Sequence, residues 1–241
     1  MATAAVTAVT ELIPSFSGKL LQPDDALFDD ARRVHNGFVD KKPGVIARCL
    51  GAADVADALG LARKLGLEVA VRGGGHNVGG RGTIDGGLLV DLSLMKGLHV
   101  DPKARTARAE GGTLWKEFNR ATQLHGLATT GGAVSSTGVA GLTLGGGLGW
   151  LMAKHGMALD NLVSVEIVLA DGRAVRASSD ENPDLFWAVR GGGGNFGVVT
   201  SFEFQLHQVG PMIMGGLVAH PVSQAKDVLR LYRDLTASAS D

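Results

Sequence analysis

The amino-acid sequence predicts an α+β fold, and three observations favour that class. Stretches with apolar residues at helical spacing are mixed with short apolar or alternating stretches typical of strands. Two pairs of predicted strands are joined by short turns, at Pro102–Lys103 and at Asp171–Gly172, as in antiparallel hairpins. Helices and strands do not alternate regularly, so the pattern is not that of a chain of βαβ units.

The first half of the chain contains most of the predicted elements. Predicted helices cover 24–35, 53–65 and 113–124, and predicted strands cover 45–48, 68–71, 88–92, 98–101 and 106–110. The helix at 53–65 has apolar residues at helical spacing and is followed by Gly66, a common C-terminal stop. Residues 106–110 alternate between apolar and polar side chains, which indicates a strand.

The second half continues with a hairpin, a short helix and a final strand. Predicted strands at 163–169 and 174–177 flank Asp171–Gly172, which is a strong turn signal. The predicted helix at 183–190 has proline near its start, where a missing N–H is tolerated. A strand is predicted at 198–204, and residues 224–235 have a helix-like pattern.

Composition and charge exclude several classes of protein. The 241 residues suffice for one large or two modest domains. A net charge of -1 argues against a nucleic-acid-binding protein, which needs a basic face. The single cysteine, Cys49, excludes an intramolecular disulfide, and its apolar neighbours favour an inert core thiol. Residues 1–10 lack the basic segment of a signal peptide, so we expect a floppy tail and a cytoplasmic protein.

An uncharged stretch at 127–153 is long enough to cross a bilayer. It contains eight glycines and several small hydroxyl side chains, however, and such a segment inserts poorly into a membrane. We therefore expect this stretch to pack inside the protein, and we predict no membrane contact.

Glycine is about twice as frequent as usual, with 36 residues, and 21 of these lie in three clusters at 73–87, 131–149 and 191–197. In the first cluster, a predicted strand leads directly into Arg72-Gly-Gly-Gly-His76-Asn77. Consecutive glycines allow backbone N–H groups to converge on an anion such as a diphosphate. A tight turn carrying a surface histidine fits this segment equally well.

The second cluster adds bare backbone and small hydroxyl groups, including Gly131 and the segment Thr137-Gly138-Val-Ala-Gly141. Two cradles with few charges suit a long, flat ligand that has a diphosphate in its middle, and FAD fits that description. We therefore include Gly131 among the cofactor-binding residues. The alternative is close backbone packing without a ligand.

Other nucleotide-binding, catalytic and metal-binding motifs are either absent or occur in the wrong structural context. The third cluster satisfies G-x-G-x-x-G at 192–197, but a predicted helix precedes it and a strand follows, which reverses the order of a dinucleotide fingerprint. We therefore assign it to a loop. There is no phosphate-binding P-loop and no G-x-S-x-G elbow. The seven histidines have no metal-ligand spacing, so we predict no metal site.

Four ordered motifs between residues 41 and 209 carry a family resemblance. They are RGGGHN at 72–77, STGVAGLTLGGGLGWL at 136–151, HGMALDNLVSVEIVLADG at 155–172 and DLFWAVRGGGGNFGVVTSFEF at 184–204. The chain resembles the FAD-linked oxidases of the vanillyl-alcohol-oxidase/PCMH superfamily, and within it the berberine-bridge-enzyme-like (BBE-like) group. The resemblance implies a PCMH-type FAD-binding domain built of two α+β subdomains.

The resemblance also implies roles for particular residues. The pyrophosphate loop would comprise Arg72, Gly73, Gly74, Gly75, His76 and Asn77, with His76 bonded to the 8α-methyl group of FAD. The isoalloxazine ring would lie along Thr137, Gly138 and Gly141. Gly146 and Gly147 would lie beneath the cofactor, and Val163 would contact its adenine end. Asp160 and Asn161 are interpreted as residues that fix a loop.

Two positions depart from some members of the family. Val134 stands where a second, cysteinyl bond to FAD forms, so a single attachment is expected. Leu142 stands where other members have a histidine near the flavin N1 edge. Stabilisation of reduced flavin must then come from backbone N–H groups or from elsewhere.

The resemblance implies three regions: an N-terminal tail and helix at 1–40, the FAD-binding domain at 41–209, and the incomplete start of a substrate-binding domain at 210–241. Relatives continue beyond this point, so we expect a fragment, and no catalytic base can be assigned. The implied function is an oxidase that transfers hydride from an alcohol, sugar or amine-type metabolite to flavin N5, with dioxygen as acceptor. The alternatives are a non-catalytic FAD-binding module and a purely structural domain.

Overall fold

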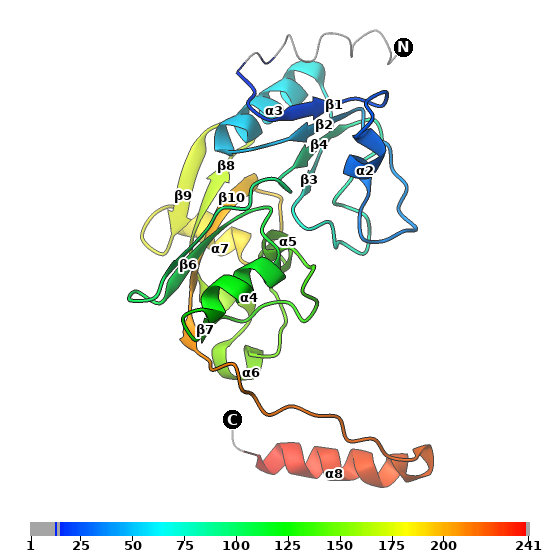
Figure 1. Ribbon diagram of the computed structural model, residues 1–241, viewed down its shortest axis with the longest axis vertical. Coiled ribbons are helices and arrows are strands. Elements are labelled where there is room, and N and C mark those ends of the chain that lie inside the picture. The colour runs from blue at the N-terminus through cyan, green and yellow to red at the C-terminus, as the bar shows by residue number, and fades with distance from the viewer. Residues whose placement is uncertain (1–12, 14, 240–241) are drawn as a thin grey trace. The chain divides into compact units, whose positions relative to one another are not determined.

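The computed structural model describes Ile13 and residues 15–239 (Figure 1). The floppy tail expected for residues 1–10 lies outside this described part. The chain divides into two units, of which the first ends at Val209 and the second begins at Gly210. Each unit is described by itself below.

The first sheet of the larger unit is mixed and has the strand order β1-β2-β4-β3. Its strands are β1 (Lys19–Leu21), β2 (Val45–Arg48), β3 (Val69–Arg72) and β4 (Leu88–Asp91), with α2 (Phe28–Arg32) and α3 (Ala52–Leu65) beside them. Strand β4 pairs with both β2 and β3 in parallel, whereas β1 is antiparallel to β2. The sequence predicts β2, β3 and β4 as strands but not how they pair. Strands β2 and β3 run in the same direction because the crossover helix α3 lies between them in the chain.

The second sheet is antiparallel and has the order β5-β6-β10-β8-β9. Its strands are β5 (Leu98–Asp101), β6 (Thr106–Glu110), β8 (Leu162–Val168), β9 (Ala174–Ser178) and β10 (Val198–Gln205). Both predicted hairpins are confirmed, because β5 pairs with β6 and β8 pairs with β9. The α+β class is confirmed, since this antiparallel sheet is combined with helices.

Several short elements complete the larger unit. They are α4 (Trp115–Gln123), β7 (Leu127–Ala128), α5 (Val139–Leu144), α6 (Met152–His155), the 3₁₀ turn η1 (Ala158–Asn161), α7 (Pro183–Val189) and β11 (His207–Gln208). The uncharged stretch at 127–153 thus folds as short pieces, and no helix among the described residues is long and apolar enough to cross a membrane.

Two of the predicted helices are shorter in the structure. The helix expected at 24–35 is α2, which ends because Arg33 has an extended backbone. The helix expected at 113–124 begins at Trp115, because Leu114 is extended and its N–H donates to the carboxylate of Glu117 at 2.8 Å. The sequence does not predict helices α5 and α6, because they are six and four residues long and give too few positions for helical spacing to be recognised.

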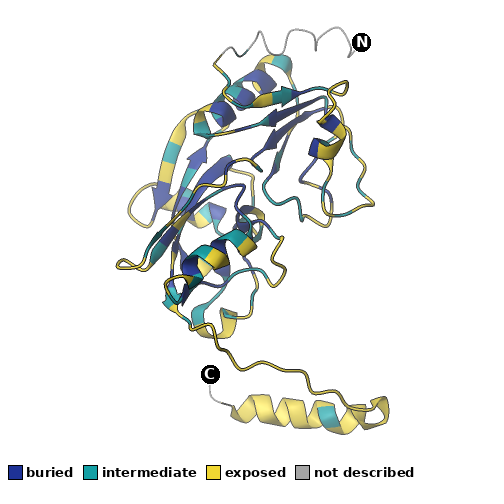
Figure 2. Ribbon diagram, in the orientation of Figure 1, coloured by how far each residue is buried: buried dark blue, intermediate teal, exposed yellow. Residues whose placement is uncertain are grey.

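The buried apolar side chains form three clusters, one on the antiparallel sheet and two on the mixed sheet, and one of the latter also takes in Val168 and Val198 of the antiparallel sheet (Figure 2). Under α4, the rings of Trp115, Phe118 and Phe204 pack edge to face, with centroids 5.2 to 6.0 Å apart. Each such fully buried side chain contributes on the order of 1.5–3 kcal/mol. The expected core thiol is confirmed, since Cys49 is fully buried and burial raises its pKa far above the ordinary value.

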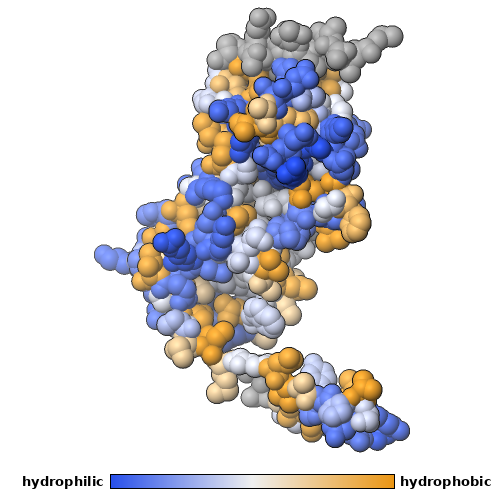
Figure 3. Space-filling model, turned by 45° about the vertical axis from the view of Figure 1, so that its right-hand side comes forward, coloured by the Kyte–Doolittle hydropathy of each residue, from blue (hydrophilic) through white to orange (hydrophobic). Residues whose placement is uncertain are grey.

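The smaller unit contains the 3₁₀ turn η2 (Val222–Gln224) and helix α8 (Ala225–Ser238), which confirms the helix expected at 224–235. The apolar side chains Leu229, Leu231, Tyr232 and Leu235 of α8 are exposed. Figure 3 shows apolar and polar groups side by side on the surface of this unit.

Candidate functional site

The first glycine cluster begins where β3 ends, at the carboxyl end of the parallel strands. Five consecutive residues from Gly73 to Asn77 have backbone N–H groups that find no acceptor within the described part of the chain. The four residues from Gly73 to His76 are half-buried, where backbone donors are normally paired, so this run indicates an external acceptor. The loop has the chemistry of an anion cradle, as the sequence predicts.

The side chain of Arg72 is directed into the protein. Its guanidinium forms an ion pair with the buried carboxylate of Asp91, with Nη2 and Oδ2 2.8 Å apart, and Nη1 donates to the carbonyl of Arg33 at 2.9 Å. Arg48 approaches the same carboxylate at 3.3 Å. Arg72 therefore fixes the base of the loop, although it also lines the cavity described below.

The first and second glycine clusters touch through bare backbone. A Cβ atom on Gly74 would lie 2.3 Å from the nitrogen of Gly138, and one on Gly73 would lie 2.7 Å from the carbonyl oxygen of Gly111. No side chain fits at such distances. The two loops therefore form one continuous wall.

The third glycine cluster belongs to the same site, which the sequence did not reveal. The N–H groups of Gly191 and Gly193 both donate to the carbonyl of Leu144, at 3.1 and 3.0 Å. This pair of hydrogen bonds fastens the third cluster to the end of α5. All three clusters consequently line one cavity of about 690 Å³. The predicted order of helix before strand around this cluster is confirmed by α7 and β10.

Most of the predicted cofactor residues meet at this cavity, and four do not. Its lining includes Arg72, Gly73, Gly74, Gly75, His76, Asn77, Thr137, Gly138 and Gly141. Gly131 lies against the ring of Trp115 instead, and Gly147 lies against Ala158. The carbonyl of Gly146 accepts a hydrogen bond from the N–H of Leu159, and Val163 is an exposed residue of β8.

Gly141 is informative because it faces open space. A Cβ atom there would meet no described protein atom within 4 Å, although the residue lines the cavity. Packing within the protein therefore does not require glycine at this position. A flat ligand lying against the backbone would require it.

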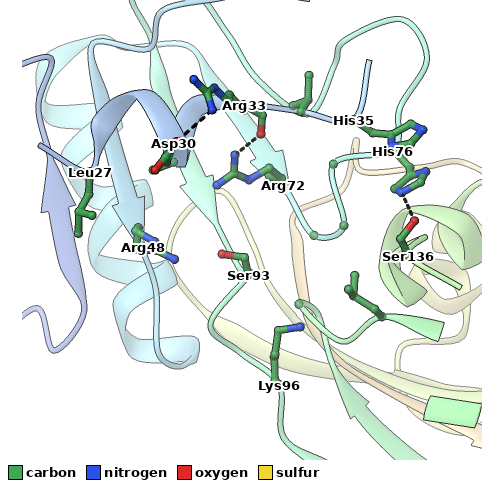
Figure 4. A pocket seen from close by; sticks show the side chains of 17 residues that line it. Leu27, Asp30, Arg33, His35, Arg48, Arg72, His76, Ser93, Lys96 and Ser136 are labelled. Carbon is green, nitrogen blue, oxygen red and sulfur yellow. Dashed lines mark hydrogen bonds and ion pairs between the residues drawn. The ribbon is translucent and has the colours of Figure 1, made fainter. Parts of the chain in front are cut away.

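His76 lies at the exit of the first loop and is held by two neighbours (Figure 4). Its Nε2 is 3.0 Å from the Oγ of Ser136, and its ring is stacked on that of His35 with centroids 3.9 Å apart and planes 13° apart. Burial, and then the nearby His35, lower the pKa of His76 below its ordinary value. The ring is therefore predominantly neutral at neutral pH and can act as a nucleophile.

Two further residues of the site carry no signal in the sequence pattern. His35 follows α2 and reaches His76 across some forty positions of sequence, so only the fold brings the two together. Arg81 lines the large cavity, and its guanidinium has no carboxylate partner within the described residues. Arg81 is therefore a cation available to a phosphate group.

A second cavity of about 560 Å³ shares the loop from Arg72 to His76 (Figure 4). Its other charged lining residues are Asp30, Arg33, Arg48 and Lys96. The three cations among these residues, and Arg72 itself, are each ion-paired with a carboxylate: Arg48 and Arg72 with Asp91, Arg33 with Asp30 and Lys96 with Glu117. The positive charge of this cavity is thus largely compensated.

The interpretation of Asp160 and Asn161 as loop-fixing residues is confirmed. The carboxylate of Asp160 accepts the N–H of Met157 at 2.8 Å, and the Nδ2 of Asn161 donates to the carbonyls of His155 and Met157. The Oδ1 of Asn161 also accepts from the Nε2 of His207 at 2.6 Å.

These features fit FAD. A run of free N–H groups suits a diphosphate, Arg81 supplies a cation, and bare glycine backbone suits a flat ring. Within the described residues, no three His, Cys, Asp or Glu side chains are grouped to hold a metal ion.

Comparisons with known proteins identify the family of the chain. Residues 43–178 match the model of a family described as FAD binding domain. (R)-6-hydroxynicotine oxidase of Paenarthrobacter nicotinovorans is 40% identical over 94% of this chain and 50% of its own length. The crystal structure of 6-hydroxy-D-nicotine oxidase from Arthrobacter nicotinovorans has a TM-score of 0.88 at 40% identity, over 92% of this chain and 49% of that one.

A structure of glucooligosaccharide oxidase from Acremonium strictum has a TM-score of 0.78 at 33% identity, over 83% of this chain and 43% of that one. Its FAD is described as 6-S-cysteinyl, 8α-N1-histidyl. The chain thus spans about half the length of the relatives that it matches.

Proposed function

Because the chain belongs to the FAD-binding-domain family of FAD-linked oxidoreductases, within the BBE-like group of the vanillyl-alcohol-oxidase/PCMH superfamily, we propose that it is the cofactor-binding half of an FAD-dependent oxidase. The observation that carries this proposal is the run of five unpaired backbone N–H groups from Gly73 to Asn77, in a cavity that all three glycine clusters line.

When bound, FAD supplies the redox chemistry, in which N5 accepts hydride from an alcohol, sugar or amine-type substrate and dioxygen takes up the electrons as hydrogen peroxide. The chain's own residues orient the cofactor. The loop N–H groups and Arg81 hold the diphosphate, and the backbone at Thr137, Gly138 and Gly141 supports the ring. Two relatives support the substrate classes by their names, one acting on a hydroxynicotine and one on glucooligosaccharides.

We further propose that the FAD is bonded covalently through His76 alone. The neutral ring of His76 at the mouth of the loop supports this, as does the histidyl FAD of the Acremonium enzyme. Val134, at the position of the second attachment, has no nucleophilic group and cannot form a cysteinyl bond.

Acid denaturation tests the attachment. The chain is saturated with FAD and precipitated in acid, and the flavin absorbance of the pellet is measured. The wild type is expected to give a yellow pellet, and His76→Ala a colourless one with FAD binding retained before acid treatment, because the backbone cradle remains. The variant His125→Ala, at an exposed histidine outside both cavities, is the matched control and should keep its colour. A colourless wild-type pellet would contradict covalent attachment.

Catalytic competence requires a separate test. The full reading frame is loaded with FAD and mixed anaerobically with alcohol, sugar and amine substrates while the flavin absorbance is followed. Bleaching by one of these classes supports an oxidase. Stable bound FAD that no substrate reduces supports the alternative, a non-catalytic FAD-binding module.

A further inference from the structure

The imidazole of His76 is held from two sides by segments that are distant in sequence (Figure 4). His35 stacks on its face, with ring centroids 3.9 Å apart, and the Oγ of Ser136 lies 3.0 Å from its Nε2. We propose that His35 and Ser136 are positioning residues that prepare His76 for flavin attachment. This inference rests on the function proposed above and concerns how that attachment is achieved.

His35 is exposed at the surface, yet its backbone is fixed to the glycine loop. Its N–H donates to the carbonyl of Gly75 at 3.0 Å. On either side, the carbonyl of Arg33 accepts from Arg72 at 2.9 Å, and the Nδ2 of Asn36 donates to the carbonyl of Val78 at 2.9 Å. Three successive anchors therefore fix the backbone at His35 beside the glycine loop, from which its ring reaches the face of His76.

A stacked partner restrains the plane of an imidazole and leaves its edge free. The attacking electron pair of a ring nitrogen lies in that plane, so a neighbour on the face does not block it. Ser136 occupies the edge at Nε2, whereas Nδ1 has no hydrogen-bond partner within the described residues. When Nε2–H donates to Ser136, the free pair is on Nδ1. His35 thus restrains the ring plane, and Ser136 favours the Nε2–H tautomer when its hydroxyl accepts this hydrogen bond.

The stack also disfavours protonation of His76. Two imidazolium ions at this separation would repel each other, and a protonated ring has no free electron pair. Arg33 and Arg72 line the same cavity, although Asp30 and Asp91 pair with them. The lowered pKa of His76, caused first by burial and then by His35, agrees with this geometry.

Covalent attachment of the flavin is a two-electron oxidation, for which dioxygen is the oxidant. A ring nitrogen of His76 forms a bond to the 8α-methyl carbon of FAD while one methyl C–H bond and the imidazole N–H bond break. Two protons leave, and the two electrons remain on the ring system of FAD until dioxygen accepts them and forms hydrogen peroxide. The residues of the chain supply the nucleophile and its orientation.

The first test measures how fast acid-stable flavin forms after FAD is added to the chain. His35→Ala is expected to slow attachment at least about tenfold, because the ring plane is no longer fixed, with FAD affinity before attachment within about twofold of the wild type. His35→Phe, which keeps a flat ring on the face of His76, should restore the rate to within about threefold. His125→Ala should match the wild type.

The second test uses the side-chain ¹⁵N spectrum of His76 without added FAD. The wild type is expected to show the Nε2–H tautomer, and Ser136→Ala a mixture of both tautomers. A wild-type rate in His35→Ala, a loss that His35→Phe does not restore, or an unchanged tautomer in Ser136→Ala would contradict the positioning role. Loss of all flavin from the wild type in acid would instead contradict attachment itself, and the role with it.

Discussion

The backbone of Gly74 lies directly against that of Gly138. A Cβ atom on Gly74 would be 2.3 Å from the nitrogen of Gly138, and a Cβ atom on Gly138 would be 2.4 Å from the nitrogen of Gly74. Real Cβ atoms do not approach backbone so closely, and no flexible side chain is available to move aside. Two clusters more than sixty residues apart are thereby joined into one rigid wall of the cavity.

Gly74→Ala is therefore expected to push the two loops apart. Overpacking of this kind costs about 1–3 kcal/mol, and urea denaturation followed by fluorescence would measure the loss of unfolding free energy. FAD affinity should fall as well. Gly79→Ala is the matched control, because its Cβ would meet only the side chain of Asn77 at an ordinary 3.5 Å. Equal stability of the two variants would contradict the tight contact.

Asp91→Asn tests the buried ion pair at the base of the loop. It leaves Arg72 without its counter-charge, and breaking such a pair costs about 3–5 kcal/mol. The exposed pair of Asp171 with Arg173 is the matched control, for which Asp171→Asn should cost less than about 1 kcal/mol. Chemical denaturation of both variants provides the comparison. A loss at Asp91 no larger than at Asp171 would show that the pair is not essential.

Gly141→Leu should fill the cavity without disturbing the protein. The introduced side chain would meet open space, and glycine is about 0.8–1 kcal/mol less favourable in a helix than alanine, to which leucine is close. We expect unchanged or increased thermal stability of the chain without FAD, and FAD affinity lowered at least about tenfold. Gly60→Leu is the control, because Gly60 is also helical and faces open space but lies outside both cavities. Fluorescence titration with FAD measures both variants.

Arg81→Gln removes the unpaired cation from the cavity. We expect FAD affinity to fall about three- to tenfold and to depend less on salt concentration, because one charge-assisted contact to the diphosphate is lost. Arg120→Gln, at an exposed position of α4, should leave both quantities unchanged. Titrations at two ionic strengths separate the outcomes, and an identical salt dependence in Arg81→Gln would exclude contact with the diphosphate.

The stability of the chain should fall on mild acidification. His155 and His207 are stacked with centroids 3.9 Å apart, and burial is the main cause that lowers the pKa of each below the ordinary 6.5. The unfolded chain then binds more protons, so this contribution is present above about pH 6.5 and is lost as the pH falls through the lower folded values.

Urea midpoints measured from about pH 7.5 to about pH 5.5 should show this loss in the wild type and a smaller one in His207→Gln. Glutamine can still donate to Asn161 but does not titrate in this range. His99→Gln, at an exposed histidine of β5, should keep the wild-type slope. A slope in His207→Gln as steep as in the wild type would contradict a role for the stack.

Local sequence signals predict much of the antiparallel sheet but little of the mixed one. The Asp171–Gly172 turn predicts an antiparallel hairpin, because the two strands that it joins are adjacent in sequence. The parallel pairing of β2 and β3 with β4 depends on a crossover through α3, and no local residue pattern records which strands then become neighbours. Strand β1 is three residues long and gives too few positions for a period to be recognised.

The same distinction applies to the candidate site. The RGGGHN segment predicts its anion cradle, because a run of glycines is itself the functional feature. Gly191 and Gly193 could be placed at the cavity only through their bonds to Leu144, which is far away in sequence. His35 has an ordinary setting in the sequence, and its proximity to His76 arises solely from folding. Functional groups that act through bare backbone are therefore more predictable than those that act through contact between distant segments.

The segment that carries His35 has a consequence for the entropy of cofactor binding. Its bonds to Arg72, Gly75 and Val78 order a loop that glycine would otherwise leave with many backbone conformations. The free-energy cost of restricting those conformations is therefore part of folding and not of cofactor binding. In the proposed site a dinucleotide would meet N–H groups of a loop that is already ordered, so more of its interaction energy would be available as affinity. Glycine thus provides access to the backbone here without the flexibility that usually accompanies it.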